Sequence, residues 1–263
     1  MTCLSLSGCG LGLVLLSGCA TSGPNHVYLT MTDNSAVHDL GPPRAEVSGV
    51  LAPGEQALGL AYDFNTDHLF VRLARSIRVI ERPSGKILRE MPLPDNSPAD
   101  DVVGTNTGPA GAGNGVHSAD LAIRSSDRHL FAVLPEGRSV VELTLFGEVV
   151  RRIELRGAAG PIGGLAYDQK NGRLLVLTAT SQARVSAVGP EGFVIYYMTS
   201  LPGVNPVSLG YDSATGHFFV PLSDGVSLGE FDAAGNLRLT HQADGANAIT
   251  AVDAGPRSFL RVF

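Results

Sequence analysis

The stretch that decides the fold is Gly164-Leu165-Ala166-Tyr167-Asp168-Gln169-Lys170-Asn171-Gly172-Arg173-Leu174-Leu175-Val176. It consists of an apolar run, a polar turn and a second apolar run. An Asn-Gly pair between two apolar runs is a strong β-hairpin signal, and it predicts positive φ at both turn residues. The stretch therefore predicts two neighbouring antiparallel strands.

The same pattern returns along the chain. Clear copies occupy 59–71 and 208–220, a weaker copy occupies 120–131, and a fifth occupies 249–260, with Asp253 in the position of Asp168. Asp168 and Asp212 are 44 residues apart, and Asp212 and Asp253 are 41 apart. This spacing is typical of the four-stranded blades of a β-propeller. Because Asp caps turn amides with its side chain, we interpret the repeated Asp63, Asp168 and Asp212 as turn builders rather than catalytic groups.

The rest of the chain fits an all-β protein. Two further strand patterns follow each hairpin, and no segment of twelve residues shows an apolar stripe of helical period. Residues 26–32, 36–40 and 45–51 supply three strands of a blade without its innermost strand, and 248–252 supply an innermost strand. We therefore predict five four-stranded blades, the first shared by both ends of the chain, which hides the sheet edges. The remaining four blades are predicted at roughly 56–94, 117–156, 161–201 and 205–242. The alternative is six blades with one incomplete, since 258–263 form a strand pattern without a place.

The Tyr-Asp-x-x-x-Gly-x-Leu-x-Val units resemble the NHL and YVTN-type β-propeller repeats of bacterial secreted proteins. The resemblance covers most of residues 26–263. It implies the fold, but members of these families include binding scaffolds and lactonase-like hydrolases, so the function has to come from a site.

Composition narrows the function. The formal net charge is −6, and no cluster of Lys and Arg is present, so we expect no nucleic-acid partner. Trp is absent and aromatic residues make up 6% of the chain, which argues against a stacking platform for sugars or single strands.

The amino-terminal segment has the features of an export signal. Residues 10–16 are an apolar run that is too short to span a bilayer, and Leu16-Ser17-Gly18-Cys19 follows it. This motif resembles the lipobox of bacterial lipoproteins, which implies removal of 1–18 and acylation of Cys19. The organisation would then be a lipidated Cys19 with a tether at 19–25, followed by a propeller domain at 26–263. Ala20 after the cysteine implies the outer membrane rather than the inner one. No cysteine follows Cys19, so disulfides and thiolate catalysis are not expected in the domain.

Four polar residues are candidates for a site at the mouth of the channel. Counting seven residues back from the Asp position of each repeat gives Gln56, Asn205 and, in the weaker copy, His117, and Asn247 lies beside the fifth such position. Their amide and imidazole groups can orient a polar ligand or hold a cation, but they equally suit strand ends that bind water. Since carboxylates are missing from this set, we predict no metal and no other cofactor.

The one long insertion is 95–116, which contains Asp100, Asp101 and a glycine-rich run. It is either a lid over the channel beside His117 or a solvated loop. The histidines of the repeats, His68, His129 and His217, are expected to be structural. Gly225-Val226-Ser227-Leu228-Gly229 matches a nucleophile elbow only as a string, since it falls inside a predicted strand.

The sequence thus predicts a lipid-anchored, extracytoplasmic β-propeller that binds a protein or small-ligand partner at the cell envelope, and it leaves open whether the protein is an enzyme. One alternative is a lactonase-like hydrolase at the channel mouth, with His117 and Asp101 as acid and base. Another is a structural protein of an envelope assembly.

Overall fold

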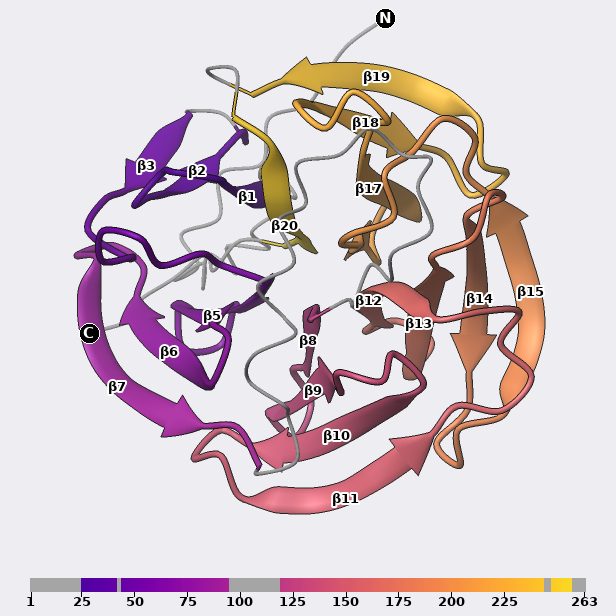
Figure 1. The fold of residues 1–263 in the computed structure, drawn as a ribbon, viewed down its shortest axis with the longest axis horizontal. Coiled ribbons are helices and arrows are strands. Elements are labelled where there is room, and N and C mark those ends of the chain that lie inside the picture. Colours follow the sequence, from indigo (N-terminus) through magenta and orange to yellow (C-terminus); the bar gives the residue numbers. More distant parts are fainter. Residues whose placement is uncertain (1–24, 42–43, 95–118, 244–246, 257–263) are drawn as a thin grey trace, which may run out of the picture.

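The computed structural model describes residues 25–41, 44–94, 119–243 and 247–256. All the secondary structure in these ranges is β, and five four-stranded antiparallel sheets are arranged as blades around a central axis (Figure 1). This confirms the predicted five-bladed β-propeller. No sixth sheet occurs in the described ranges, and the predicted strand at 258–263 lies outside them.

Each blade runs from an innermost strand at the channel to an outermost strand at the rim. Blade 1 contains β20 (Ile249–Gly255), β1 (His26–Met31), β2 (Val37–Asp39) and β3 (Ala45–Val47). Blade 2 contains β4 (Gly59–Asp63), β5 (His68–Arg72), β6 (Ser76–Glu81) and β7 (Lys86–Pro92). Blade 3 contains β8 (Leu121–Arg124), β9 (His129–Val133), β10 (Ser139–Thr144) and β11 (Val149–Glu154). Blade 4 contains β12 (Ile162–Asp168), β13 (Arg173–Thr178), β14 (Arg184–Val188) and β15 (Val194–Ser200). Blade 5 contains β16 (Gly210–Asp212), β17 (His217–Pro221), β18 (Ser227–Phe231) and β19 (Leu237–Gln242).

The two ends of the described chain close the ring, as predicted. β20 pairs with β1 over six residue pairs from His26↔Gly255 to Met31↔Ile249. The carboxyl-terminal strand thereby becomes the innermost strand of the blade that the amino-terminal strands begin. A ring closed in this way leaves no inner edge free for another chain to pair with.

The register of β20 corrects the alignment of the fifth repeat. Gly255 lies opposite His26 at the start of β1, just as Asp63 lies opposite His68 at the start of β5. Asp253 therefore corresponds to Ala61 rather than to Asp63. The error arose because the sequence pattern contains an Asp two residues early, and only the pairing fixes the register.

The predicted hairpin turn also differs in detail. Gly172 has a φ of 64°, and its N–H donates to the carbonyl of Asp168 at 2.8 Å, but Asn171 is not among the described residues with positive φ. The turn therefore needs a left-handed residue at one position only. Asp67 and Arg128 occupy that position in two other blades, with φ of 58° and 60°.

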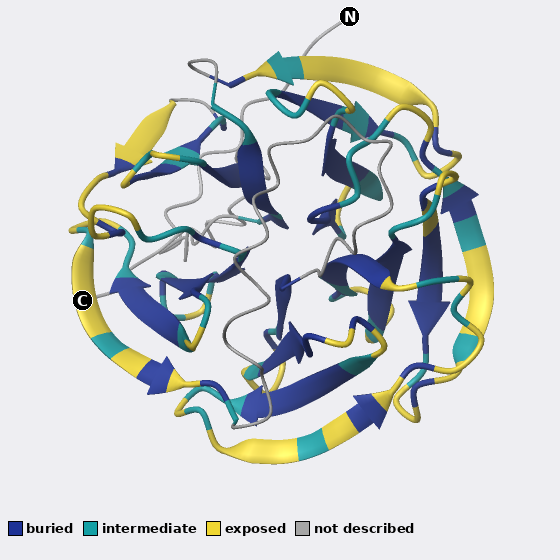
Figure 2. Ribbon diagram, in the orientation of Figure 1, coloured by how far each residue is buried: buried dark blue, intermediate teal, exposed yellow. Residues whose placement is uncertain are grey.

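Burial follows the strand order within each blade. The inner strands are almost entirely buried, and the exposed residues gather on the outermost strands (Figure 2). Apolar clusters lie between neighbouring blades; one of them joins Tyr28, Val37, Leu60 and Ile80 of blades 1 and 2. The ring is therefore held by blade-to-blade packing, and its centre is reached only by the inner strands.

Candidate functional site

Backbone N–H groups line the channel. In an antiparallel pair, alternate residues of a strand direct their N–H away from the partner, and on an innermost strand these groups face the axis. One such residue from each blade lies at the same height along the axis, and we call each set of five a level. The first level consists of Leu60, Leu121, Leu165, Leu209 and Val252, and the second of Tyr62, Ile123, Tyr167, Tyr211 and Ala254. A buried N–H needs an acceptor, so the side chains that reach the axis decide what the channel can hold.

Asp120 satisfies most of the first level. Its Oδ2 accepts the N–H of Leu165 at 2.8 Å and of Leu209 at 3.0 Å, and its Oδ1 accepts its neighbour Leu121 N–H at 3.0 Å. The Ser208 hydroxyl is 3.0 Å from Oδ1 and accepts the Val252 N–H at 2.9 Å. One carboxyl group and one hydroxyl thus join the inner strands of blades 1, 3, 4 and 5.

The position of Asp120 explains how it reaches the axis. In the corresponding position the other inner strands carry Gly59, Gly164, Ser208 and Ala251. A Cβ on Gly164 would lie 2.7 Å from the backbone nitrogen of Leu209, so blades meet backbone to backbone there. The small residues at this position in the other blades leave room at the axis, and the carboxyl group of Asp120 occupies it.

Blade 2 joins the same centre through Arg72. This arginine is 2% exposed, and its Nη1 donates to the carbonyl oxygen of Asp120 at 3.3 Å and to that of Val133. Burial lowers the pKa of Arg72 to about 10, and the nearby Asp120 opposes that shift. Asp120 and its hydrogen-bond partners therefore connect all five blades.

Asp120 is placed to exchange a proton without rearrangement of the backbone. Burial raises the pKa of its carboxyl group to about 8, although the Leu165, Leu209 and Leu121 N–H groups and Ser208 oppose the shift. When Asp120 is ionised, Ser208 donates to Oδ1. When Oδ1 is protonated, it can donate to Ser208, whose hydroxyl hydrogen then turns to the Val252 carbonyl 3.4 Å away.

The second level of the channel is built differently. Asp253 corresponds to Ala61, Ala122, Ala166 and Gly210 of the other blades. Its Oδ2 accepts the Tyr62 N–H at 3.0 Å and lies 3.2 Å from His26 Nε2, which therefore carries the hydrogen. None of the described residues supplies an acceptor for the second-level N–H groups of Ile123, Tyr167, Tyr211 and Ala254.

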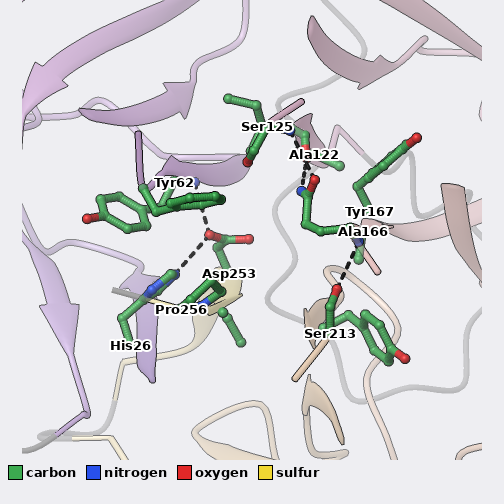
Figure 3. Close-up of a pocket in the computed structure, with 15 residues that line it drawn as sticks. His26, Tyr62, Ala122, Ser125, Ala166, Tyr167, Ser213, Asp253 and Pro256 are labelled. Atoms are coloured by element: carbon green, nitrogen blue, oxygen red, sulfur yellow. Dashed lines mark hydrogen bonds and ion pairs between the residues drawn. The ribbon is translucent and has the colours of Figure 1, made fainter. Parts of the chain in front are cut away.

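These groups surround a small cavity at the end of the channel where the inner strands finish (Figure 3). The centre of a water molecule has about 30 Å³ in which to lie, and since about 10–15 Å³ on this measure is enough for one water, the cavity can hold only a few. Aromatic rings wall one side: His26 stacks on Tyr28 with centroids 4.3 Å apart, and Tyr62 meets His26 edge-on at 4.5 Å. His26 is 2% exposed, and its Nδ1 has no hydrogen-bond partner. The cavity therefore offers N–H donors and one carboxylate to a molecule the size of water.

Side chains at the rim of this cavity link neighbouring blades. Gln169 accepts the Ser125 N–H at 3.0 Å and donates to the Ile123 carbonyl at 2.6 Å, while its own N–H donates to Ser213 Oγ at 2.9 Å. These contacts are inter-blade hydrogen bonds, and they occupy polar groups that a ligand would otherwise use.

A larger hollow lies between blades 3 and 4, near the start of β12. Its volume is about 170 Å³, and it is lined by Gly137, Arg138, Leu155, Ile162 and residues 158–160. Arg138 is the one ionisable side chain of this lining, so the hollow does not bring together groups for acid–base chemistry.

The predicted residues of the mouth are only partly placed. Gln56, Asn205 and Asn247 are half-buried, and among the described residues their side chains form no hydrogen bond with one another. The corrected register makes Ala248, not its neighbour Asn247, the counterpart of Gln56. His117, Asp100, Asp101 and Cys19 lie outside the described residues. The ring at the mouth therefore stays a prediction.

The site residues predicted from the sequence include neither Asp120 nor His26, and they do not include Asp253. A signal for Asp120 was present, because the weaker repeat reads Asp120-Leu121-Ala122 where the others read Gly59-Leu60-Ala61 and Gly164-Leu165-Ala166. Glu55, the other carboxylate near the mouth, accepts from Arg78 Nη1 at 2.6 Å. That hydrogen bond lowers the pKa of Glu55, and it commits the carboxylate to an ion pair.

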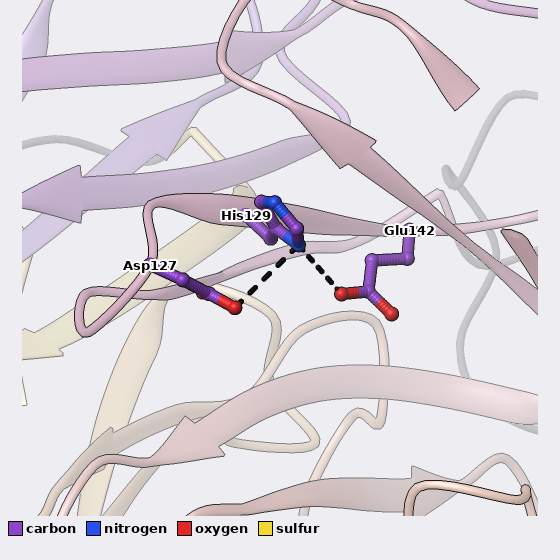
Figure 4. A group of neighbouring side chains, drawn as sticks. All are labelled: Asp127, His129 and Glu142. Atoms are coloured by element: carbon purple, nitrogen blue, oxygen red, sulfur yellow. Dashed lines mark hydrogen bonds and ion pairs between the residues drawn. The ribbon is translucent and has the colours of Figure 1, made fainter. Parts of the chain in front are cut away.

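One group of side chains has the composition of a metal site. The carboxylates of Asp127 and Glu142 and the imidazole of His129 lie close together on blade 3 (Figure 4). Arg124 donates to both carboxylates, and Arg151 donates to Glu142 at 2.7 Å. Burial raises the pKa of Glu142, but the hydrogen bonds from His129 and Arg151 and the charge of Arg124 bring it below the usual value. Since a guanidinium already neutralises these oxygens, the group does not fit a cation and is an ion-pair network.

No protein-family model matches this chain, and no curated protein is similar to it in sequence. Solved structures are similar in fold. A chain of the nidogen/laminin complex matches with a TM-score of 0.58 at 11% identity, over 90% of this chain and 100% of that one. A protein of unknown function from Bacteroides caccae has a TM-score of 0.45 at 15% identity, over 84% of this chain and 74% of its own. Virginiamycin B lyase from Staphylococcus aureus also has a TM-score of 0.45, at 12% identity, over 84% and 67%. Such a likeness shows the β-propeller fold alone.

Proposed function

We propose that this protein is a lipid-anchored β-propeller of the bacterial cell envelope that binds a partner through its outer surface. The observation that carries the proposal is the closed centre: Asp120 links the inner strands at the axis, and the adjoining cavity has room for only a few water molecules. Among the described residues, neither this cavity nor the hollow of about 170 Å³ at the start of β12 reaches the roughly 300 Å³ or more of a usual substrate pocket, so the ring offers its faces and rim for contact. The similar chain of the nidogen/laminin complex comes from a structure of two associated proteins, which agrees with such a use of the fold.

The anchor is proposed from Leu16-Ser17-Gly18-Cys19 and from its resemblance to a lipobox. With the lipid on Cys19, residues 20–25 would tether blade 1 to the membrane, facing the periplasm or the exterior. Several acyl chains would make the attachment stable. No helix in the described ranges is long and apolar enough to cross a membrane.

Labelling of growing cells with radioactive palmitate tests the anchor. We expect the wild-type protein to carry label and Cys19→Ala to lose it. The matched control is Cys9→Ala, because Leu6-Ser7-Gly8-Cys9 repeats the motif with too little apolar sequence before it, so this variant should keep the label. Label on neither the wild type nor Cys9→Ala refutes the anchor and leaves the binding role to be tested separately.

A lactonase-like hydrolase is the second candidate, and the pairing of His26 with Asp253 in the cavity is the observation in its favour. The predicted pair for this chemistry is His117 and Asp101. Hydrolysis of a panel of lactones by the purified protein, compared with Asp253→Asn and His117→Ala, separates the two functions. A turnover that the wild type shows and either variant loses would replace the binding proposal.

A further inference from the structure

The outer strand of blade 4 differs from the other strands of the rim. Phe193, Ile195, Tyr196 and Tyr197 are 54%, 60%, 42% and 50% exposed, and they follow one another along β15 and the residue before it. Figure 2 shows this strand on the perimeter of the ring. Large contiguous apolar patches are uncommon on the surface of monomeric proteins and mark sites of contact.

The other outer strands carry protection against pairing. β7 contains Lys86 and Arg89, β11 contains Arg151 and Arg152, and β19 contains Arg238. β3 is three residues long. Charged side chains and short length are the usual means by which an edge strand avoids another chain. β15 has seven residues and no charged one, so it lacks both.

Arginines hold the aromatic rings of this edge in place. Arg173 lies over Tyr196 with its guanidinium carbon 5.1 Å from the ring centre, and Arg184 lies over Tyr197 at 5.5 Å. At the start of the edge, Arg156 lies over Phe193 at 5.3 Å. Tyr and Arg are the residues enriched at the energetic centres of protein interfaces, and rings already fixed lose little freedom on binding.

The backbone limits how such a contact forms. Pairing of β14 with β15 is irregular on both sides of the pairs Ser186↔Tyr197 and Ala187↔Tyr196. A regular ladder with another strand is therefore restricted to the neighbourhood of these two tyrosines. Most of the contact would come from side chains rather than from backbone hydrogen bonds.

The charges at the two ends of the edge select the occupant. Exposed Glu191 precedes β15, and exposed Arg184 lies opposite Ser200 near its other end. Among the described residues Arg184 contacts no carboxylate and Glu191 contacts no cation. When two copies of β15 pair antiparallel, the amino-terminal end of one strand lies beside the carboxyl-terminal end of the other. Glu191 of each copy then lies toward the end of the partner's edge at which the Arg184 backbone lies, while the middle of β15, which has no charged residue of its own, meets itself under the guanidinium groups of Arg173 and Arg184.

We propose that β15 is a self-association edge on which a second copy of this chain docks its own β15, antiparallel, about a two-fold axis beside Tyr196 and Tyr197. The contact is small, so the dimer is weak, with dissociation in the micromolar range. The other outer strands would bring like charges together in the same arrangement.

Sedimentation equilibrium of the full-length protein in mild detergent measures this association. We expect the wild type to shift from monomer to dimer as its concentration rises through the micromolar range. Tyr196→Lys should weaken the dimer at least about tenfold, because it places a like charge beside the two-fold axis. Val150→Lys is the matched control: Val150 is 45% exposed on β11, which is already charged, and this variant should dimerise as the wild type does.

Charge reversal tests the arrangement independently of folding. Arg184→Glu alone and Glu191→Arg alone should each weaken the dimer several-fold, since each sets like charges together at both ends. A mixture of the two single variants should form a heterodimer, and the double variant should recover the wild-type affinity.

Three results would overturn the proposal. One is a wild type that stays monomeric up to about 100 μM, well above the concentration of about 1 μM at which a weak dimer begins to form. Another is a dimer that none of these substitutions weakens, which would place the contact on another face. The third is a monomer that, as Cys19→Ala without its own lipid, binds vesicles of uncharged phosphatidylcholine and loses this binding on Tyr196→Lys, which would assign the edge to a lipid surface.

Discussion

Two carboxylates reach the channel at successive levels, and they stand in different surroundings. Asp120 is fully buried, and its oxygens accept from N–H groups of three inner strands and contact Ser208. Asp253 is partly exposed, accepts one backbone N–H and His26, and borders the cavity. The first level is closed by a side chain, whereas the second leaves N–H groups for a small molecule. At both levels one blade carries an aspartate where the other blades carry a small residue. At the first level this aspartate connects the blades, whereas at the second it borders an open cavity.

The largest expected effect separates the two levels directly. Asp120→Ala should lower the free energy of unfolding by about 4 kcal/mol, because it leaves several buried N–H groups without an acceptor. Asp253→Ala should cost about 1 kcal/mol, since water can reach the groups that it exposes. Urea denaturation measures both. Equal losses would show that the two carboxylates contribute equally to stability, which contradicts the difference between the levels.

The pH dependence of stability tests the proton on Asp120. Burial raises the pKa of this group from 3.8 to about 8. Between these values the folded protein holds a proton that the unfolded chain has released, so stability falls as the pH rises, by at most about 1.4 kcal/mol per pH unit. Above about pH 8 this contribution levels off.

Urea denaturation at intervals between pH 5 and pH 8, for the wild type and Asp120→Asn, measures the difference. The amide can donate to Ser208 and accept from Leu165 and Leu209, as the protonated acid does. It leaves the Leu121 N–H without its acceptor at every pH, and it does not titrate. The slope assigned to Asp120 should therefore vanish in the variant. Parallel curves would mean that this carboxyl group does not titrate in that range.

A smaller effect is expected at Ser208, which connects blade 1 to Asp120. Ser208→Ala removes the acceptor of the Val252 N–H and one partner of Asp120 Oδ1. We expect a loss of about 1–2 kcal/mol. Hydrogen exchange at the Val252 amide should become faster, since β20 is released from the centre. Ser227→Ala, a buried hydroxyl in the outer part of blade 5, serves as the comparison. A Val252 amide that exchanges at the wild-type rate in Ser208→Ala would contradict the connection.

The smallest effect concerns the open level. Ala122→Ser would add a hydroxyl at the level of Asp253, where the structure has N–H groups without an acceptor. We expect a change in stability of less than about 1 kcal/mol and, in a crystal structure of the variant, a hydroxyl that replaces water in the cavity. A loss of several kcal/mol would show that this level is as closely packed as the first.

The sequence by itself determined the class of fold and the closure of the ring by both ends, and it favoured five blades over six. These follow from local properties: apolar runs of strand length, turn residues between them, and a period that fits one blade. Where the pattern was strongest, in the hairpin of 164–176, the strands are where it predicted them.

Only the tertiary structure decided which residues meet at the axis. Asp120 and Ser208 are 88 residues apart in sequence, Ser208 and Val252 are 44 apart, and each looks ordinary within its own strand. Their contact depends on the register of five sheets and on how closely the inner strands approach. The sequence pattern has a period of two residues along each strand, so it fixes which face a side chain takes but not the level in the channel at which it lies. For the same reason the repeat alignment placed Asp253 one period away from its true level, and the cavity beside it became visible only in the folded ring.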